Sequence, residues 1–249
     1  MTIQLSECVF RYRRWSQPTL NGLSFTVPDG LTILLGPNGA GKSTFLKLAA
    51  GLLLPNSGTV THEELSSDST AYRQQVAWMP QSIVPMPRLT AREYVAYAGW
   101  LRGMSTQAAH EAAVPALAQV DLAKLADKKS HHLSGGQLRR LGLAAALVHD
   151  AKILLLDEPT AGMDPHQRRI FRDIVGDLSQ RMKVVISTHD IADLAEEADS
   201  VAVLVNGAII HKGPTASFLS LSPADVVEGR RAEASYSALL RQFEPASAS

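Results

Sequence analysis

The sequence predicts an α/β fold built on a parallel sheet, with a small antiparallel sheet before it and a helical insertion inside it. Short apolar runs alternate with longer segments of helical composition, which is typical of parallel strands joined by crossover helices. Residues 1–30 instead alternate polar and apolar side chains around turns at Asn21-Gly22 and Pro28-Asp29-Gly30. Residues 83–132 are rich in alanine and carry no strong strand pattern, which predicts a helical subdomain.

The parallel sheet follows from four apolar runs and the segments between them. Continuous apolar runs of this length are consistent with buried strands. The expected strands are 31–35, 153–156, 184–187 and 201–205, and the expected helices are 42–53, 135–149, 165–182 and 191–198. We expect a single domain over residues 1–221 and a polar C-terminal tail, 222–249, whose last residues fray and whose role the sequence does not reveal.

The composition limits the classes of protein to which the chain can belong. Its 249 residues are 45% hydrophobic and 19% charged, so global disorder is excluded. The net charge of zero argues against nucleic acid as the main partner. The single cysteine, Cys8, excludes an internal disulfide and fits a reducing compartment. With neither a signal sequence nor an apolar run long enough to span a bilayer, the chain is expected to touch membranes only through a partner.

A glycine-rich loop between the first apolar run and a helix carries the strongest motif. Its sequence fits G-x-x-x-x-G-K-[ST], which holds nucleotide phosphates on backbone N–H groups and a helix N-terminus. Lys42 is expected to reach the β- and γ-phosphates of ATP, and the Ser43 hydroxyl is expected to hold Mg²⁺. The expected nucleotide-binding residues of this loop are Gly36, Pro37, Asn38, Gly39, Ala40, Gly41, Lys42, Ser43 and Thr44.

Two carboxylates stand at the exit of the second apolar run. Asp157 is expected to join the Mg²⁺ shell, as an aspartate at a strand end does in phosphate-loop ATPases. Glu158 is placed to orient or deprotonate the attacking water. Beside the phosphate loop, this pair predicts phosphoryl transfer to water more strongly than a simple helix cap.

A second glycine-rich helix start makes the resemblance specific. In Leu133-Ser134-Gly135-Gly136-Gln137, the serine can cap a helix whose glycines leave N–H groups bare. The motif resembles the signature of the ATP-binding cassette (ABC) ATPases. The resemblance implies that Ser134, Gly135, Gly136 and Gln137 face an ATP held by a second copy, or by a related ATPase subunit, in a head-to-tail dimer.

Four further residues match the pattern of the same family. Gln81 resembles the glutamine that senses Mg²⁺ and the attacking water, and His189 resembles the switch histidine that contacts the γ-phosphate. Asp164, in Ala161-Gly162-Met163-Asp164, resembles the loop that meets its twin across the dimer, although Met163 replaces the more usual leucine. Tyr12 is the expected adenine-stacking aromatic, with Phe10 and Trp15 nearby.

The resemblance implies the nucleotide-binding subunit of a transporter with a separate transmembrane permease subunit. Its expected place is the cytoplasmic face of a bacterial plasma membrane. Segments 87–94, 101–103 and 138–141 resemble ATPases of bacterial drug, antibiotic or peptide exporters. Two alternatives stay open: the ATPase of an importer for metal or another small solute, and a soluble ABC ATPase that works without a membrane.

One helical face can be interpreted in two ways. Tyr94, Tyr97, Ala98 and Leu101 recur at i, i+3, i+4 and i+7. We expect this face to form the core of the helical subdomain. The alternative is a groove for a helix of the permease, to which the apolar segment 83–87 would contribute. The adjacent His131 and His132 lack partner ligands and are expected to be plain loop residues.

Overall fold

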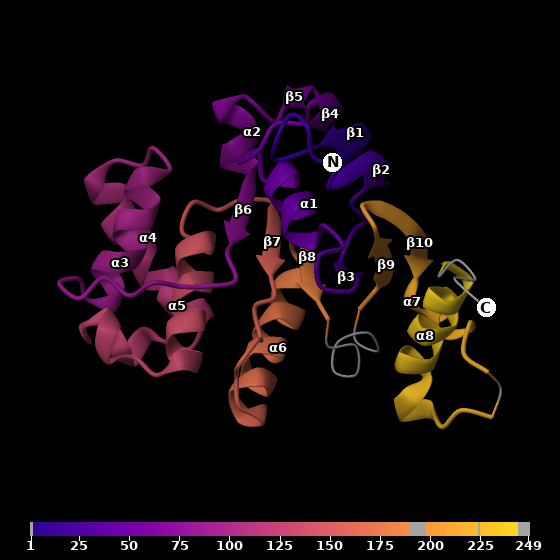
Figure 1. Ribbon diagram of the computed structural model, residues 1–249. Coiled ribbons are helices and arrows are strands. Elements are labelled where there is room, and N and C mark those ends of the chain that lie inside the picture. The colour runs from indigo at the N-terminus through magenta and orange to yellow at the C-terminus, as the bar shows by residue number, and fades with distance from the viewer. Residues whose placement is uncertain (1, 190–197, 224, 244–249) are drawn as a thin grey trace.

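The computed structural model describes residues 2–189, 198–223 and 225–243. Figure 1 shows a central sheet with a smaller sheet above it and helices on either side. The strands are β1 (Ile3–Phe10), β2 (Leu20–Thr26), β3 (Leu31–Leu35), β4 (Ser57–His62), β5 (Leu65–Ser66), β6 (Val76–Met79), β7 (Ile153–Asp157), β8 (Lys183–Thr188), β9 (Ser200–Val205) and β10 (Ala208–Pro214). The α-helices are α1 (Lys42–Ala49), α2 (Thr70–Gln75), α3 (Ala91–Leu101), α4 (Thr106–Gln119), α5 (Gly135–Leu147), α6 (Pro165–Ser179), α7 (Thr215–Leu219) and α8 (Arg231–Phe243).

The two sheets confirm the predicted fold class. The smaller sheet is antiparallel in the order β2-β1-β4-β5, and the larger runs β10-β9-β3-β8-β7-β6. The larger sheet is parallel from β9 to β6, and β10 pairs antiparallel to β9 at its edge. All four predicted strands belong to it. β6 and β10 were not predicted, because β6 has four residues and β10 buries none of its residues fully.

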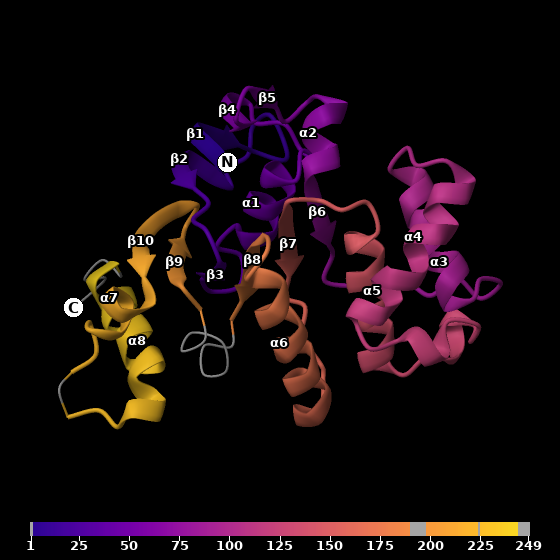
Figure 2. The same ribbon diagram turned by 180° about the vertical axis from the view of Figure 1, so that it is seen from behind.

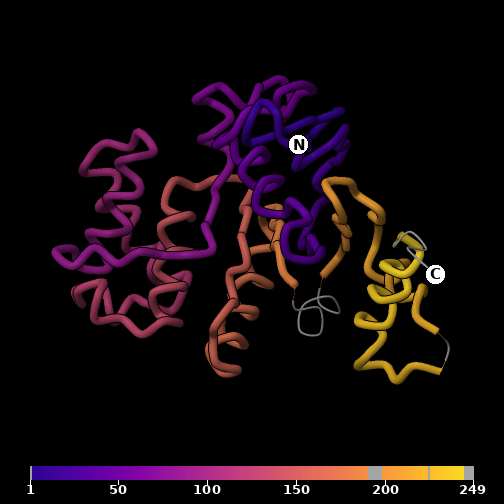
Figure 3. The backbone as a smooth tube through the Cα atoms, viewed as in Figure 1, coloured from indigo at the N-terminus to yellow at the C-terminus, as the bar shows by residue number. Residues whose placement is uncertain are grey.

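Helices α3, α4 and α5 form a helical layer at one end of the sheet, opposite α7 and α8 (Figures 1 and 2). The tube in Figure 3 follows the chain from β6 through an extended loop into α3. Thr90 caps α3 in a capping box with Glu93, which fixes where that helix begins. Fully buried alanines of α4, including Ala109 and Ala113, let the helices pack closely.

The core interpretation of the Tyr94 face is wrong for its outer half. α3 buries Ala91, Val95, Ala96 and Gly99, whereas Tyr97 is 40% exposed and Leu101 is 61% exposed. Small residues occupy the inner face of α3 because α3 and α4 approach each other too closely for larger side chains. A Cβ at Gly99 would lie 2.9 Å from the Met104 sulfur and 3.3 Å from the Ala109 methyl group.

The C-terminal segment contains a helix that was not predicted. α8 buries Ala232, Ser235 and Leu239, and the Ser235 hydroxyl donates to the Leu219 carbonyl at 3.4 Å. Its polar, alanine-rich composition favours a tail, although its buried residues recur at helical spacing. Helices α1, α5 and α6 end earlier than predicted, and the predicted helix 191–198 lies, except for its last residue, outside the described residues.

The stability of the fold should depend on His149, which follows α5. Burial, together with the neighbouring Arg102 cation, lowers the pKa of His149 to about 4. The unfolded chain, with a histidine pKa near 6.5, therefore binds this proton first as the pH falls. We expect this group to cost roughly 3 kcal/mol of stability between pH 6.5 and pH 4, with no further loss below. Urea unfolding at pH 7 and pH 4.5 measures the free energy of unfolding. Between these two pH values, the free energy should fall less for His149→Phe than for wild type; an equal fall in both proteins would contradict the assignment.

Candidate functional site

The glycine-rich loop lies where β3, fully buried in the sheet, meets the start of α1. Two of its glycines are required by the close approach of other backbone. A Cβ at Gly36 would lie 2.3 Å from the Leu204 carbonyl oxygen. Gly41 has φ +105°, and a Cβ there would lie 3.0 Å from the Thr19 carbonyl oxygen. These contacts hold the loop against the N-terminus of α1, where an anion is favoured.

A cleft of about 430 Å³ opens above this loop. It brings together the phosphate loop with the predicted catalytic residues Gln81, Glu158 and His189, which follow β6, β7 and β8. These positions are the carboxyl ends of neighbouring parallel strands, where ligands bind in open α/β sheets. The lining residues are Thr19, Asn38, Gly39, Gly41, Lys42, Ser43, Thr44, Gln81, Glu158 and His189. Thr19 was not predicted, because an isolated threonine carries no sequence signal.

Lys42 is the buried cation of the cleft. Its Nζ donates to the carbonyl oxygens of Gly36 at 2.7 Å and Pro37 at 3.2 Å, and lies 3.9 Å from Glu158 Oε1. Burial lowers the pKa of Lys42, while the carboxylates of Glu158 and Asp157 act to raise it. A phosphate chain would supply stronger acceptors than the two carbonyls and compensate the same buried charge.

Replacing Lys42 with alanine should weaken nucleotide binding itself. Loss of a charge-assisted hydrogen bond costs about 1.5–3 kcal/mol, which corresponds to a roughly 10- to 100-fold rise in the Kd for ATP. Titration of a fluorescent ATP analogue measures this effect. Lys47→Ala, on the same helix but outside the cleft, is the matched control. Unchanged binding by Lys42→Ala would show that this lysine does not hold phosphate.

Asp157 and Ser43 form the candidate Mg²⁺ position. Asp157 is 4% exposed, and its Oδ1 accepts from the Ser43 hydroxyl at 3.0 Å and from the Ser187 hydroxyl at 2.7 Å. Carboxylate and hydroxyl oxygens are the hard ligands that Mg²⁺ prefers, so the donor set fits that ion. Ser187, near the end of β8, orients the carboxylate; no motif in the sequence predicts this role.

Glu158 is held in a left-handed conformation, φ +43°. Its N–H donates to the Ser187 carbonyl at 3.1 Å and hydroxyl at 3.0 Å, which compensates the strain. The Gln81 amide nitrogen donates to Glu158 Oε2 at 2.9 Å, and His189 Nδ1 lies 3.4 Å from Glu158 Oε1. The structure therefore brings the three predicted catalytic side chains together, with Gln81 and His189 both in contact with the Glu158 carboxylate. Gln81, predicted also as a metal ligand, contacts Glu158 rather than Asp157.

Tyr12 stands at the lip of the cleft. Its hydroxyl lies 3.0 Å from Thr44 Oγ1 and its ring packs edge-on against Phe10, with 58% of the residue exposed. An exposed ring beside the first turn of α1 is available for stacking on a base. Trp15, the other exposed aromatic of this loop, is instead paired with the Arg14 guanidinium at 5.4 Å.

The signature residues do not line the phosphate cleft. Ser134 caps α5 in a capping box with Gln137, with bonds of 3.3 and 3.0 Å. Both Ser134 and Gly135 are exposed, and nothing lies within 4 Å of a Cβ built at Gly135. Asp164 likewise lies outside the cleft and caps α6 through the Gln167 N–H at 2.9 Å. The chain thus presents a second, solvent-facing helix N-terminus suited to an anion.

Comparison with known proteins agrees with this geometry. Residues 20–161 match the family model of the ABC transporter. The Nod factor export ATP-binding protein I of Burkholderia lata is 42% identical over 214 residues, which cover 84% of this chain and 70% of that protein. The linearmycin resistance ATP-binding protein LnrL of Bacillus subtilis is 32% identical over 84% of this chain and 68% of its own length.

Solved structures share the fold. A dimeric bacterial ABC transporter cassette, MJ0796, superposes with a TM-score of 0.75 at 25% identity, over 86% of this chain and 98% of that one. An ATP-binding subunit of an ABC transporter gives a TM-score of 0.79 at 24% identity, over 98% of this chain and 100% of that one. No helix in the described part of the chain is long and apolar enough to cross a bilayer. The chain therefore belongs to the ABC transporter family and is one of its ATPases.

Proposed function

We propose that this chain is the ATP-hydrolysing subunit of a bacterial exporter, working with a separate transmembrane subunit at the cytoplasmic face of the membrane. The observation that carries the proposal is the convergence of Lys42, Gln81, Glu158 and His189 on one cleft, with an intact signature exposed on the same chain. The relatives named for Nod factor export and linearmycin resistance support export. None of the relatives cited here is named for import or for a soluble function, so these two alternatives are less favoured.

The cleft supports hydrolysis by positioning and charge. The glycine-rich loop and Lys42 hold the β- and γ-phosphates, and Tyr12 stacks on adenine. Ser43 and Asp157 would hold Mg²⁺, which when bound would supply positive charge against the phosphates. The Glu158 carboxylate takes a proton from water, whose oxygen bonds to the γ-phosphorus as the bond to the bridging oxygen breaks. ADP and phosphate are released, while Gln81 and His189 orient the water and the γ-phosphate.

The exposed signature supports a composite site. Because Ser134 and Gly135 lie outside their own cleft, the exposed N-terminus of α5 can face the γ-phosphate of an ATP held by a second copy or by a related subunit. A head-to-tail pair satisfies both clefts at once, since each chain contributes one of each part. Asp164, which caps α6 beside the signature helix, is placed to contact its counterpart in the pair.

A groove on the helical layer supports contact with the permease. It measures about 370 Å³ between α3 and α4, and its apolar lining includes Leu89, Ala96, Tyr97 and Trp100. The rings of Tyr97 and Trp100 stack 5.9 Å apart and are both exposed. Exposed aromatic pairs beside an apolar groove mark partner contacts. This helix face is therefore better interpreted as a groove for a helix of the permease than as the core of the helical subdomain.

Copurification of the membrane partner tests the proposal. Tagged Glu158→Gln protein is extracted from gently solubilised native membranes, and the captured proteins are identified by mass spectrometry. We expect a polytopic membrane protein in near-equal amount, lost in a Tyr97→Asp background. Phe243→Ala, which alters another exposed aromatic at the end of α8, should leave the yield unchanged. Capture of a soluble complex without a membrane protein would overturn the transporter assignment.

A further inference from the structure

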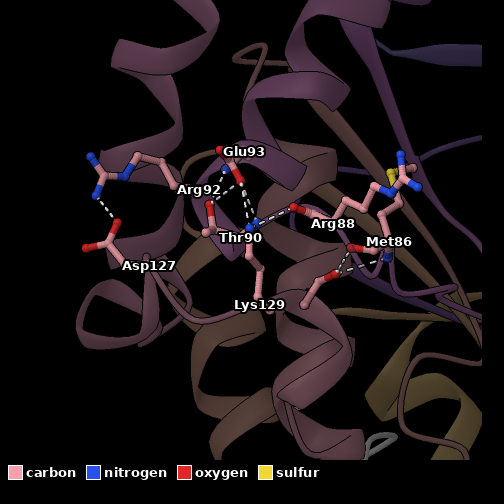
Figure 4. A network of polar contacts seen from close by, with 8 residues as sticks. Met86, Arg88, Thr90, Arg92, Glu93, Asp127 and Lys129 are labelled. Atoms are coloured by element: carbon pink, nitrogen blue, oxygen red, sulfur yellow. Dashed lines mark hydrogen bonds and ion pairs between the residues drawn. The ribbon is translucent and has the colours of Figure 1, made fainter.

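Two segments far apart in the sequence are strapped together beside the catalytic cleft. The loop that follows Gln81 runs along residues 126–130, which lead directly into the signature (Figure 4). Thr90 and Lys129 form an antiparallel bridge, and the N–H groups of Ala91 and Arg92 donate to the carbonyl oxygens of Lys128 and Ala126, each at 2.9 Å. We call residues 86–92 with 126–130 the strap.

Ser130 is the buried centre of the strap. The residue is 0% exposed, and its hydroxyl lies between both polar groups of the Met86 backbone. It accepts from the Met86 N–H at 3.0 Å and donates to the Met86 carbonyl at 2.7 Å. Its own N–H donates to the Leu89 carbonyl at 2.9 Å. Three hydrogen bonds from one buried residue thus fix the loop.

The outer edge of the strap is weaker and more exposed. Lys129 Nζ donates to the Arg88 carbonyl at 2.7 Å and lies 3.9 Å from Glu93 Oε2 (Figure 4). Arg92 pairs with Asp127. Exposed ion pairs contribute little to stability, so the buried hydroxyl of Ser130 is the stronger restraint on the loop.

The strap joins the two parts of the proposed catalytic site. At one end, Gln81 donates to the Glu158 carboxylate at 2.9 Å. At the other, the 3₁₀ helix Ser130–His132 ends two residues before the Ser134 cap. Leu89 also lines the groove that we assign to the permease. A displacement of residues 86–92 would therefore reach the signature through the hydrogen bonds of the strap.

From this geometry we propose that Ser130 is a positioning residue that sets the place of the signature relative to the Gln81 loop. The proposal rests on the proposed role of the signature in a second copy's site. Ser130 does not line the nucleotide cleft. It acts through Met86 on one side and, on the other, through its carbonyl, which accepts from the Leu133 N–H at 3.3 Å. Removing its hydroxyl should leave ATP binding to the single chain intact and impair only steps that need the signature.

Three variants test the proposal in the purified full chain. Ser130→Ala removes the hydroxyl, and Ser130→Thr keeps one. Ser235→Ala is the matched control, because Ser235 is also 0% exposed and its hydroxyl also donates to a carbonyl, that of Leu219. We expect Ser130→Ala to lower kcat about fivefold or more at saturating ATP, with the Kd for a fluorescent ATP analogue within about twofold of wild type. Ser130→Thr should recover part of the loss, and Ser235→Ala should match wild type.

Amide hydrogen exchange separates positioning from a purely local structural role. In Ser130→Ala we expect faster exchange both at 86–90 and at 133–137. An increase confined to 86–90, with unchanged kcat, would overturn the proposal. If Ser130→Ala does not fold, Lys129→Met decides: faster exchange at 133–137 and a lower kcat support the strap, and wild-type values overturn it. A wild-type chain that neither hydrolyses ATP nor dimerises with it would instead contradict the proposed function, which keeps the two failures distinct.

Discussion

Glu158→Gln is expected to abolish turnover while ATP binding is retained. The amide has the size of the carboxylate and can still contact Gln81 and His189, which lie 2.9 and 3.4 Å from its oxygens. It cannot take a proton from water, and loss of a general base costs about 10² to 10⁴ in kcat. With hydrolysis blocked and the phosphates still held by Lys42, ATP should accumulate in a closed pair of chains.

Two measurements check this result. Phosphate release under saturating Mg·ATP reports turnover, and light scattering with and without ATP reports the mass of the assembly. We expect release at least about a hundredfold below wild type, and an ATP-dependent doubling of mass that persists. Undiminished hydrolysis would show that Glu158 is not the base, and the cleft would then need another acceptor for the proton of water.

Ser134→Arg is expected to prevent ATP-driven dimerisation without affecting nucleotide binding by the single chain. Ser134 is an exposed helix cap that does not line its own cleft. A long cationic side chain there fills the space in front of the α5 N-terminus, where the phosphate of a second copy's ATP would lie. Loss of the cap costs about 1 kcal/mol, which the fold should tolerate.

Ser134→Ala serves as the control, because it removes the same cap without adding bulk or charge. In a Glu158→Gln background, light scattering should show an ATP-dependent dimer for Ser134→Ala and a monomer for Ser134→Arg. A Ser134→Arg protein that still dimerises with ATP would rule out the signature as part of the interface.

The parts of the fold that the sequence predicted best are those where one residue type is physically required. Gly36 and Gly41 leave no room for a side chain, and the strand that precedes them is fully buried, so both glycines and strand stand out in the sequence. Asp157 and Glu158 could be found because two carboxylates directly follow a buried strand. The contact between Gln81 and Glu158 was not predictable from local sequence, because 77 positions separate the two residues.

The features that were missed depend on tertiary packing rather than on local pattern. Tyr97 and Leu101 have the spacing of a buried face, but Gly99 and Ala109 bring α3 and α4 so close that the larger side chains lie outside. Ser187 and Ser130 are single serines whose roles follow only from the carboxylate and the backbone that they contact. α8 was missed for another reason: its apolar residues recur at helical spacing, but its polar, alanine-rich composition is also typical of a tail.

A mixing experiment tests the central claim, that each catalytic site is shared between two chains, most directly. Lys42→Ala and Ser134→Arg proteins are assayed for ATP hydrolysis separately and then as an equal mixture, with wild type as the reference. In a head-to-tail pair, a mixed dimer joins one intact phosphate loop to one intact signature. Each mixed dimer holds one working site of two, so we expect hydrolysis well above that of either protein alone and at most about half of the wild-type rate. A mixture that stays as inactive as its components, beside an active wild type, would contradict the shared site.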